Sequence, residues 1–518
     1  MTGPREAGLA ALMDAAARAA DAGDDAQAEP LFHRIVAENP RDADAWHMLA
    51  AIAVRGGRGP EAVDLAKRAL ELDRRNAFYL NTLGIAHAET RQLEEALRCF
   101  NRALKERPGY ADGHYNLGKV YRKLGRMSEA EACYVRVRRL DPGKAEAAAN
   151  LATLRIQQGR YEEADSLLAE ARARLPHDEM LVNHAAICVL ARSGAEACVR
   201  ELAAFLESHP LAASVHAELG RRLLAEGRFG EGWREYAWRH GGVPAELPAC
   251  AGKRVLLLPD QGLGDQLFFL RFAAALRSRA AHVAFACPGK LFTLLEAMSP
   301  VSELRLASDD RSGFDLSLPL GDLPRLLGAQ DTPPPLAVRA AADRVAHWRE
   351  RLAALGPAPY LGVTWRAGTK TDDAPEFAAR GEDPLYKEID IAMLATTLGA
   401  WPGTVLVLQR LPRHAEVAAF AKALGRAAHD LSATNDDLVD MAALLHLIDD
   451  YVGVSNTNMH LRAGVGKTAR VLIPFPPEFR WMNAGDEAPW FRGFRIYRES
   501  PNRGWRPAMD SLREELGR

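Results

Sequence analysis

The sequence is poor in the features that mark a metalloprotein, a membrane protein or a nucleic-acid-binding protein. Its 518 residues include six cysteines and no C-x-x-C pair, so neither a zinc ribbon nor a dithiol redox motif is indicated. The formal net charge of −2 gives no electrostatic reason to expect nucleic acid or an anionic membrane as partner. No apolar run reaches the ~18 residues of a spanning helix, and the N-terminus has no apolar signal-peptide core. These absences predict a cytoplasmic globular protein without a transmembrane segment.

What the first 240 residues do contain is a repeat with a period of 34 residues, the spacing from Pro108 to Pro142 and on to Pro176. Small residues keep the same period in two series. One series is Ala28, Ala62, Ala96, Ala130, Ala164, Cys198 and Gly232, and the other is Ala16, Ala50, Gly84, Gly118, Ala152, Ala186 and Gly220. Two antiparallel helices pack closely only where small side chains occupy their crossing points, and proline ends a helix. The pattern therefore predicts about seven stacked helix pairs.

This pattern resembles the tetratricopeptide repeat, and the resemblance covers roughly residues 9 to 240. Such a solenoid has a concave groove that usually holds a peptide or a protein. Four amide side chains on the first helices of their pairs are expected to face the groove and to bond the backbone of an extended peptide: Asn81, Asn116, Asn150 and Asn183. The alternative is that they are ordinary polar surface residues.

After Lys253 the period changes, and short apolar segments alternate with helical stretches. Six strands are predicted: Val255–Leu258, His282–Ala286, Leu361–Trp365, Thr404–Leu408, Tyr451–Val454 and Arg470–Ile473. This alternation argues for parallel sheets with crossover helices. The predicted fold class is α + α/β, with an all-α repeat solenoid over residues 1–241 and two Rossmann-like α/β domains over 242–335 and 336–518.

The turn after the first of these strands reads PDQGLGDQLFF. Gly262 and Gly264 would let the backbone approach a ligand, and Asp265 stands where a general base is expected. The third glycine of a G-x-G-x-x-G dinucleotide motif is missing. The alternative is a glycine turn that only connects a strand to a helix.

Four segments together resemble the bacterial ADP-heptose heptosyltransferase family, and more closely the tetratricopeptide-linked glycosyltransferases related to it. They are PDQGLGDQLFFLRFAAAL, GVTWRAGTK, LYKEIDIAMLA and YVGVSNTNMHLRAGVGKTARVLIPFPPEFRWM, and the resemblance covers roughly residues 253 to 500. It implies a GT-B fold, a nucleotide-sugar donor held mainly by the second α/β domain, and no required metal or other cofactor. It also implies that Asp265 is the catalytic base, with Gln261, Gly262 and Gly264 on the acceptor side.

The resemblance assigns donor binding to nine further residues: Arg366, Lys370, Lys387, Gln409, Glu416, Ser455, Asn456, Thr457 and His460. Cations among them would balance the charge of a departing diphosphate, and the start of the helix after Val454 would offer N–H groups to phosphate oxygens. The basic residues could instead be solvated surface charges, and His460 a core histidine. The sequence departs from the family in one place, because Ser455 and Asn456 replace the usual Asp-Thr pair.

The sequence thus predicts a metal-independent, inverting glycosyltransferase that moves a sugar from a nucleotide sugar to a protein held by the repeats. Two alternatives stay open. One is a non-catalytic scaffold that retains a degenerate glycosyltransferase fold. The other is a glycosyltransferase that acts on a glycan or a lipid-linked acceptor.

Overall fold

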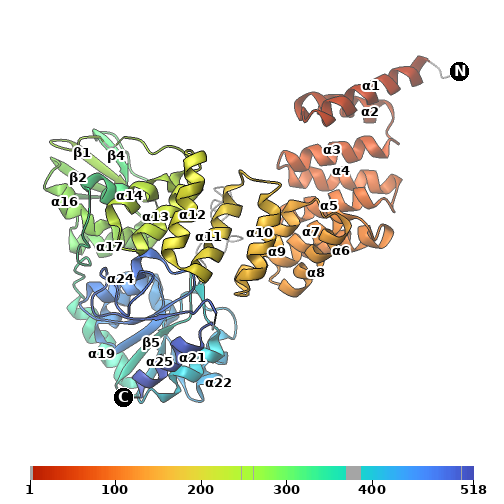
Figure 1. The fold of residues 1–518 in the computed structure, drawn as a ribbon. Coiled ribbons are helices and arrows are strands. Elements are labelled where there is room, and N and C mark those ends of the chain that lie inside the picture. The colour runs from red at the N-terminus through yellow and green to blue at the C-terminus, as the bar shows by residue number, and fades with distance from the viewer. Residues whose placement is uncertain (1–3, 247, 261, 369–386, 503, 518) are drawn as a thin grey trace. The chain divides into compact units, whose positions relative to one another are not determined.

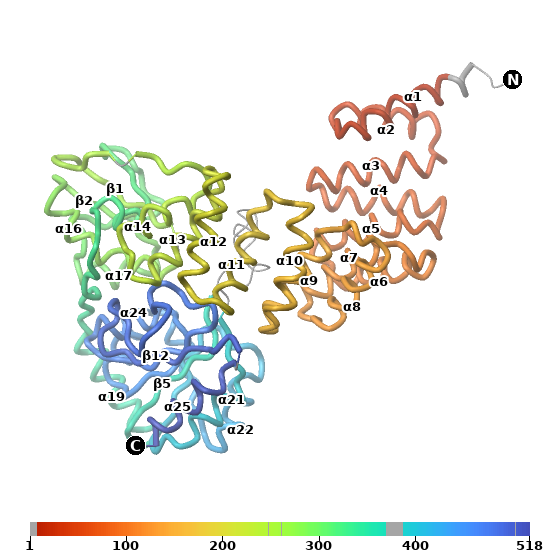
Figure 2. Tube along the Cα trace, in the orientation of Figure 1, coloured from red at the N-terminus to blue at the C-terminus, as the bar shows by residue number. Residues whose placement is uncertain are grey.

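The structure, a computed structural model, describes residues 4–246, 248–260, 262–368, 387–502 and 504–517. These residues form two compact units, Met1–Pro176 and His177–Arg518. In its described part the first unit contains helices and no strand, whereas the second contains helices and parallel sheets (Figure 1 and Figure 2). None of the described helices is long and apolar enough to cross a membrane.

Consecutive helices in the first unit pack as antiparallel pairs joined by short turns. The helices are α1 (Pro4–Asp21), α2 (Asp25–Glu38), α3 (Ala43–Arg55), α4 (Gly59–Leu72), α5 (Ala77–Glu89), α6 (Leu93–Glu106), α7 (Ala111–Lys123), α8 (Met127–Leu140), α9 (Ala145–Gln157) and α10 (Tyr161–Arg172). Pro40, Pro108 and Pro142 each come two residues after the end of the second helix of a pair. At these three pairs the second helix therefore ends just before a proline, as the repeat pattern predicted.

The crossing points explain why small residues recur. A Cβ atom at Gly84 would lie 2.6 Å from the ring of Phe100, and one at Gly118 would lie 2.8 Å from the ring of Tyr134. Real side chains do not approach so closely, so a larger residue would push the two helices of the pair apart. The glycines let the aromatic rings of α6 and α8 fill the space within each pair.

Two more helix pairs belong to the second unit and precede its sheets: α11 (Glu179–Ser193), α12 (Ala195–Ser208), α13 (Ala213–Ala225) and α14 (Phe229–Tyr236), which continues as the 3-10 helix η1 (Ala237–His240). A helical solenoid therefore runs over about the first 230 residues, and a region of parallel sheets and helices follows it. The predicted boundary at 241/242 lies inside the second unit, at the end of η1.

The first sheet has four parallel strands in the order β3-β2-β1-β4. They are β1 (Arg254–Leu258), β2 (His282–Cys287), β3 (Glu303–Leu306) and β4 (Leu316–Pro319). The helices of this part are α15 (Leu263–Phe269), α16 (Ala273–Arg277), α17 (Gly289–Met298) and α18 (Leu323–Leu327).

The second sheet has six parallel strands in the order β12-β11-β10-β5-β8-β9. They are β5 (Tyr360–Thr364), β8 (Thr404–Val407), β9 (Ala428–Asp430), β10 (Asp450–Val454), β11 (Arg470–Ile473) and β12 (Arg495–Arg498). The helices around it are α19 (Ala342–Leu355), α21 (Ile391–Thr397), α22 (Glu416–Leu424), α23 (Leu438–Leu447), α24 (Thr457–Gly464) and α25 (Arg506–Leu516). A short antiparallel pair, β6 (Arg366–Ala367) and β7 (Lys387–Glu388), follows β5. We can number these six parallel strands 1 to 6 in the order in which they follow one another along the chain. Read from β9 to β12, the sheet then has the strand order 3-2-1-4-5-6. This is the strand order of a doubly wound α/β sheet.

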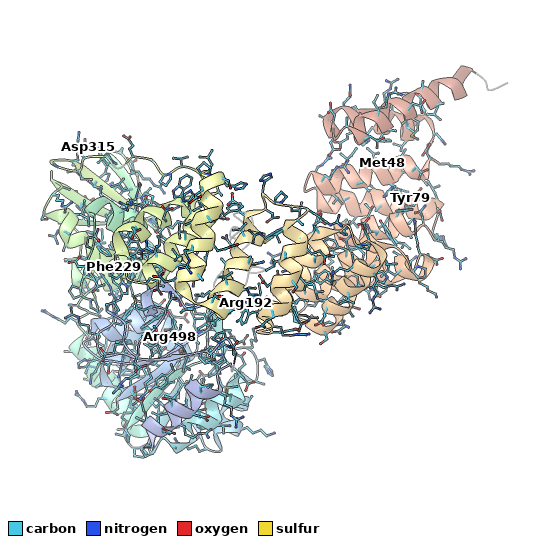
Figure 3. The ribbon with its side chains drawn as sticks, viewed as in Figure 1. Met48, Tyr79, Arg192, Phe229, Asp315 and Arg498 are labelled. Carbon is cyan, nitrogen blue, oxygen red and sulfur yellow. The ribbon has the colours of Figure 1, made fainter. Side chains whose placement is uncertain are left out.

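The last helix pair is built into the core of the second unit. Trp233 of α14 is 2% exposed, and its ring packs edge to face on Phe479, with centroids 5.6 Å apart, and on Trp490 at 6.2 Å. Phe229, labelled on α14 in Figure 3, adds a contact of 5.1 Å with Trp490. The aromatic side chains of Phe229 and Trp233 therefore join α14 to the core that follows it.

Candidate functional site

The carboxyl ends of the strands mark the region of each sheet where α/β proteins bind ligands. In an open parallel sheet the binding region lies outside the carboxyl ends of the strands, at the point where the strand order reverses. In the second sheet that point lies between β5 and β10, which are followed by residues 365–368 and 455–456. In the first sheet it lies between β1 and β4, and residues 259–265 follow β1.

Residues from these two regions meet in a connected series of ion pairs, which we call the ion chain. Asp265 in the first turn of α15 pairs with Arg480, whose guanidinium also donates to Glu478 at 2.9 Å. Glu478 forms an ion pair with Lys387 Nζ at 2.5 Å, and the same Nζ donates to the backbone oxygen of Ser455 at 3.2 Å. The ion chain therefore joins Asp265 to the loop after β10.

The ion chain is largely shielded from water. Lys387, Glu478 and Arg480 are 8%, 8% and 7% exposed, whereas the side chain of Asp265 is 26% exposed. Burial lowers the pKa of Arg480 to about 10, so this guanidinium still carries its charge at neutral pH. Buried charges are tolerated only when they are paired. The carboxylate of Asp265 is the member of the ion chain that is most exposed to solvent.

Glu478 and Arg480 were not among the predicted site residues. They lie beyond β11: Glu478 directly precedes the 3-10 helix η7 (Phe479–Trp481), and Arg480 lies within it. Because β11 is parallel to β10, its carboxyl end lies at the same edge of the sheet. The available signal was a pair of opposite charges in an otherwise apolar stretch, PPEFRW, directly after a predicted strand.

The loop after β10 is held by its own side chains. Asn456 donates to Thr364 Oγ1 at 3.0 Å and to Tyr451 OH at 3.1 Å, so its amide points back toward the sheet. Thr457 begins α24 and is half-buried. Its role and that of Ser455 and Asn456 in phosphate binding stay predictions, and the structure shows that the Asn456 amide already has two acceptors.

His460 is 7% exposed and lies among the rings of Phe268 and Phe491, with centroids 6.3 and 5.2 Å away. Its Nδ1 atom is buried without a hydrogen-bond partner among the described residues. Burial holds the pKa of His460 well below its ordinary value, and the positive charges of Arg271 and Lys387 lower it further. The imidazole is therefore neutral at physiological pH and has an unused polar atom.

A second buried guanidinium lies beside this histidine. Arg271 packs over the rings of Phe268 and Phe491, at 5.0 and 4.6 Å from their centroids, and donates to the backbone oxygen of Trp490 at 2.7 Å. Burial lowers its pKa to about 9. Arg480 lies 5.0 Å from the centroid of the same Phe268 ring. Three buried cations, Arg271, Arg480 and Lys387, thus share this region with two carboxylates, Asp265 and Glu478.

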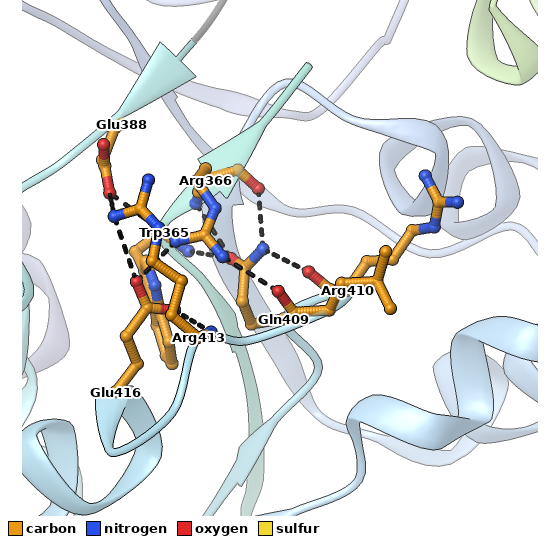
Figure 4. A network of polar contacts seen from close by, with 8 residues as sticks. Trp365, Arg366, Glu388, Gln409, Arg410, Arg413 and Glu416 are labelled. Atoms are coloured by element: carbon orange, nitrogen blue, oxygen red, sulfur yellow. Dashed lines mark hydrogen bonds and ion pairs between the residues drawn. The ribbon is translucent and has the colours of Figure 1, made fainter. Parts of the chain in front are cut away.

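The predicted residues Arg366, Gln409 and Glu416 form a separate polar network at the ends of β5 and β8 (Figure 4). Arg366 Nη1 donates to Glu416 at 2.5 Å, and Gln409 Oε1 accepts from the backbone N–H groups of Trp365 and Arg366. Burial disfavours the charge of Glu416, but hydrogen bonds from Arg366 and from the Arg413 N–H outweigh it and hold the pKa of this carboxyl below its ordinary value. These contacts fix the loops at the edge of the sheet.

Two predicted site residues, Gln261 and Lys370, lie outside the described residues. The other predicted members of the glycine loop are described: Gly262 precedes α15 and is exposed, and Gly264 lies within it. The structure therefore brings Asp265, Gly264, Lys387, Ser455 and His460 together and places Arg366, Gln409 and Glu416 in the neighbouring network.

The end of the solenoid is tied to the turn after β1. Arg239 of η1 donates to Asp260 at 2.6 Å and to Asp322 at 2.8 Å, and Asp260 also accepts from the backbone N–H of Gly321. Burial disfavours the charge of Arg239, but Tyr236 and the two carboxylates outweigh it and raise its pKa. The last helix turn is therefore part of the framework that positions the glycine loop.

The asparagines predicted for the groove partly bond to one another. Asn116 donates to Asn81 at 3.0 Å across successive repeats, and Asn150 donates to Tyr115 OH at 3.1 Å. In the second unit, Asn183 donates to Ser214 at 3.2 Å. Such bonds link neighbouring repeats, and peptide binding by these amides stays a prediction.

A cavity of about 390 Å³ lies against Trp490 and Phe491, two residues that also contact Arg271 and His460. It is lined by Thr332, Pro334, Pro335, Ala463, Gly466, Lys467, Thr468, Pro489, Trp490, Phe491, Arg492 and Phe494. We place the candidate site at the strand ends, because none of the lining residues belongs to the ion chain.

Comparison with protein families identifies the repeats. One tetratricopeptide repeat family matches residues 19–83, and another matches 81–145 and 121–179. The N-terminal region therefore consists of tetratricopeptide repeats, as the sequence pattern predicted.

Similarity to individual proteins is more distant. The chain is 28% identical over 335 residues to Protein FlbA of Caulobacter vibrioides, which covers 57% of this chain and 53% of that protein. The chain thus spans about half the length of this curated relative. Among solved structures, it is 27% identical to TTC0263, a tetratricopeptide repeat protein of Thermus thermophilus, over 35% of this chain and 99% of that one, with a TM-score of 0.32. It is 23% identical to YrrB, a tetratricopeptide repeat protein with an unusual peptide-binding site, over 35% and 92% of the two chains, with a TM-score of 0.30.

Proposed function

We propose that the second unit is an inverting glycosyltransferase of the GT-B type and that the repeats hold its protein acceptor. The observation that carries the proposal is the ion chain, which brings a partly exposed carboxylate, Asp265, together with two buried cations, Lys387 and Arg480. A base on one side and cations on the other are what sugar transfer from a nucleotide diphosphate requires.

In this proposal Asp265 accepts the proton of an acceptor hydroxyl while the hydroxyl oxygen bonds to the anomeric carbon of the donor. The bond from that carbon to the diphosphate breaks, and the diphosphate leaves with the bonding electrons. Lys387 is placed to offset the developing charge, because its Nζ already contacts the loop that opens α24. No step is assigned to a metal or a cofactor.

Two further observations support the proposal. The six-stranded sheet has the strand order of nucleotide-binding α/β domains. The predicted donor residues 455–457 and His460 follow β10, which borders the point where that order reverses, and they include the start of helix α24. The first unit consists of tetratricopeptide repeats, which form protein-interaction scaffolds. Both fit a donor on the second sheet and a protein acceptor on the repeats.

The test is donor binding followed by transfer. Nucleoside diphosphates and nucleotide sugars that bind the native state should raise the melting temperature of the full chain. With the best donor, wild type should release nucleotide in the presence of acceptor protein. Asp265→Asn should still bind the donor but lose transfer by about 100-fold or more. Asp450→Asn is a matched control, because Asp450 pairs with Arg470 at the opposite end of β10. Full transfer by Asp265→Asn would contradict the assigned role of this carboxylate.

The second candidate function is a binding scaffold without catalysis. It is favoured by the pairing of Lys387 and Arg480 with carboxylates, which balances their charges without any ligand. Calorimetry separates the two candidates, since a scaffold should neither bind nucleotide sugars nor release nucleotide. A transferase that uses a glycan or lipid-linked acceptor would be indicated if the fragment 177–518 kept transfer to small glycans.

A further inference from the structure

The ion chain restricts how any anionic ligand can reach its cations. The cations available to a diphosphate, Lys387 and Arg480, are occupied by Glu478 and Asp265. Both cations are more than nine-tenths buried, so neither can simply turn into solvent to gain a second partner. A diphosphate can therefore reach them only by replacing a carboxylate.

From this geometry we infer that Arg480 is a donor-binding residue that exchanges Asp265 for the diphosphate, so that donor binding releases the base. This role rests on the proposed function and deepens it. In the unliganded state Arg480 holds the Asp265 carboxylate through a charge-assisted hydrogen bond, and a carboxylate so engaged has fewer free lone pairs for a hydroxyl. Transfer of Arg480 to phosphate oxygens leaves Asp265 free to accept the acceptor proton.

The exchange is electrostatically balanced. The buried cations Lys387, Arg480 and Arg271 outnumber the two carboxylates by one, so the region has a net positive charge before a ligand enters. A diphosphate keeps Arg480 paired after Asp265 has left it, while Glu478 stays between the two ion-chain cations, so no buried charge is left unpaired. Asp265 is the partner best able to leave, because its side chain is 26% exposed whereas that of Glu478 is 5% exposed.

The surroundings hold Arg480 in place while its partner changes. Its guanidinium lies 5.0 Å from the centroids of both Phe268 and Phe479. Phe479 packs in turn on Trp233 at 5.6 Å, and Phe268 packs on Trp490 at 4.9 Å. The arginine is therefore fixed by ring contacts independent of its acidic partners, and only the anion beside it has to change.

Removal of either carboxylate should therefore strengthen anion binding. The probe is inorganic pyrophosphate, titrated calorimetrically into the full chain at constant ionic strength. Asp265→Asn frees Arg480, and Glu478→Gln frees both cations from their shared acceptor. Each variant should bind pyrophosphate about tenfold more tightly than wild type, a change of about 1.4 kcal/mol. Asp450→Asn, which removes a carboxylate from an ion pair at the far end of β10, should bind like wild type.

The two substitutions are nearly isosteric, and a melting curve establishes that each variant is folded. If either Asp265→Asn or Glu478→Gln fails to fold, the pyrophosphate affinity of the other variant still tests the exchange. Arg480→Gln should weaken pyrophosphate binding by about tenfold or abolish it. Equal affinity in wild type, Asp265→Asn and Glu478→Gln would overturn the exchange while leaving the anion site and the proposed function standing. Equal tightening in Asp450→Asn would also overturn it, because the effect would then be one of overall charge. A failure of pyrophosphate to bind wild type and every variant would overturn both proposals.

Discussion

Gly264 lies against the ring of His460, and a Cβ atom at position 264 would be 3.3 Å from its Cδ2 and 3.4 Å from its Nε2. The two residues belong to α15 and α24, the helices that follow β1 and β10. The missing side chain therefore lets the helices at the two strand-end regions approach each other. Gly264 therefore has a packing role between two helices, in addition to the ligand approach predicted for the glycine loop.

A larger residue at this contact should lower stability. Gly264→Val is expected to reduce the free energy of unfolding by about 1–3 kcal/mol through overpacking against His460. Gly262→Ala is the matched control in the same loop, because its Cβ would meet only the flexible end of Asp265, at 3.3 Å. The control should change stability by less than about 0.5 kcal/mol. Urea unfolding measures both, and equal losses would show that the contact with His460 is not the constraint.

The buried imidazole of His460 should make stability fall in mild acid. Burial, with the charges of Arg271 and Lys387, holds its pKa well below 6.5 in the folded state. In the unfolded chain this side chain binds a proton below about pH 6.5. Its contribution to stability is thus fully present above that pH and is lost as the pH falls toward the folded pKa, by up to about 1.4 kcal/mol per pH unit. Since other groups also titrate, the measured quantity is the difference between wild type and His460→Gln from pH 7.5 to 5. A difference that stays constant with pH would contradict this assignment.

One turn of the solenoid contains a strained residue. Gly57, Gly125 and Gly159 have φ values of 68°, 73° and 70° at the same position of their repeats, where the third repeat has Arg91 with φ 60°. Arg91 is exposed, and left-handed backbone costs an ordinary residue about 1 kcal/mol relative to glycine. Arg91→Gly should therefore raise the free energy of unfolding by about that amount, while Arg91→Ala should not raise it. Thermal unfolding of the three proteins tests the difference.

The boundary for a useful truncation lies at residue 176. A fragment of residues 177–518 retains Trp233 and Arg239 and should unfold cooperatively. A fragment that begins at residue 241 lacks both, which exposes the rings of Phe479 and Trp490 and leaves Asp260 without the cation that neutralises it. The shorter fragment should bind hydrophobic dyes and show no sharp melting transition. Equal cooperativity of the two fragments would contradict the integration of α14 into this core.

The solenoid could be predicted from the sequence because its signal is local and repeated. The small residue, the proline and the bulky residue recur at a fixed spacing, and each has a direct steric reason, as at Gly84 beside Phe100. The six predicted strands were found because they are short apolar runs. Their ends differed by a residue in places, as at β5, which begins at Tyr360.

The strands β3, β4, β9 and β12 were missed for a physical reason. They lie at or near sheet edges or contain polar residues, as in the ELRL of β3 and the AHD of β9, so they lack a continuous apolar run. The family resemblance named Asp265, Lys387 and His460 in advance, and the strand-end rule gives the physical reason why such residues lie near one another. It could not supply Glu478 and Arg480, whose place depends on an irregular segment after β11, nor the tie between Arg239 and Asp260, which joins residues on different structural elements.

The position of the last helix pair has a consequence for how such a chain can vary over generations. Insertion or loss of a whole 34-residue module before Pro176 changes the number of exposed repeat surfaces and leaves the packing around Trp233 intact. Recombination after that point would replace residues that complete an aromatic core and an ion-pair cluster. Homologous chains are therefore expected to differ in repeat number at the amino-terminal side and to keep the final pair unchanged in length.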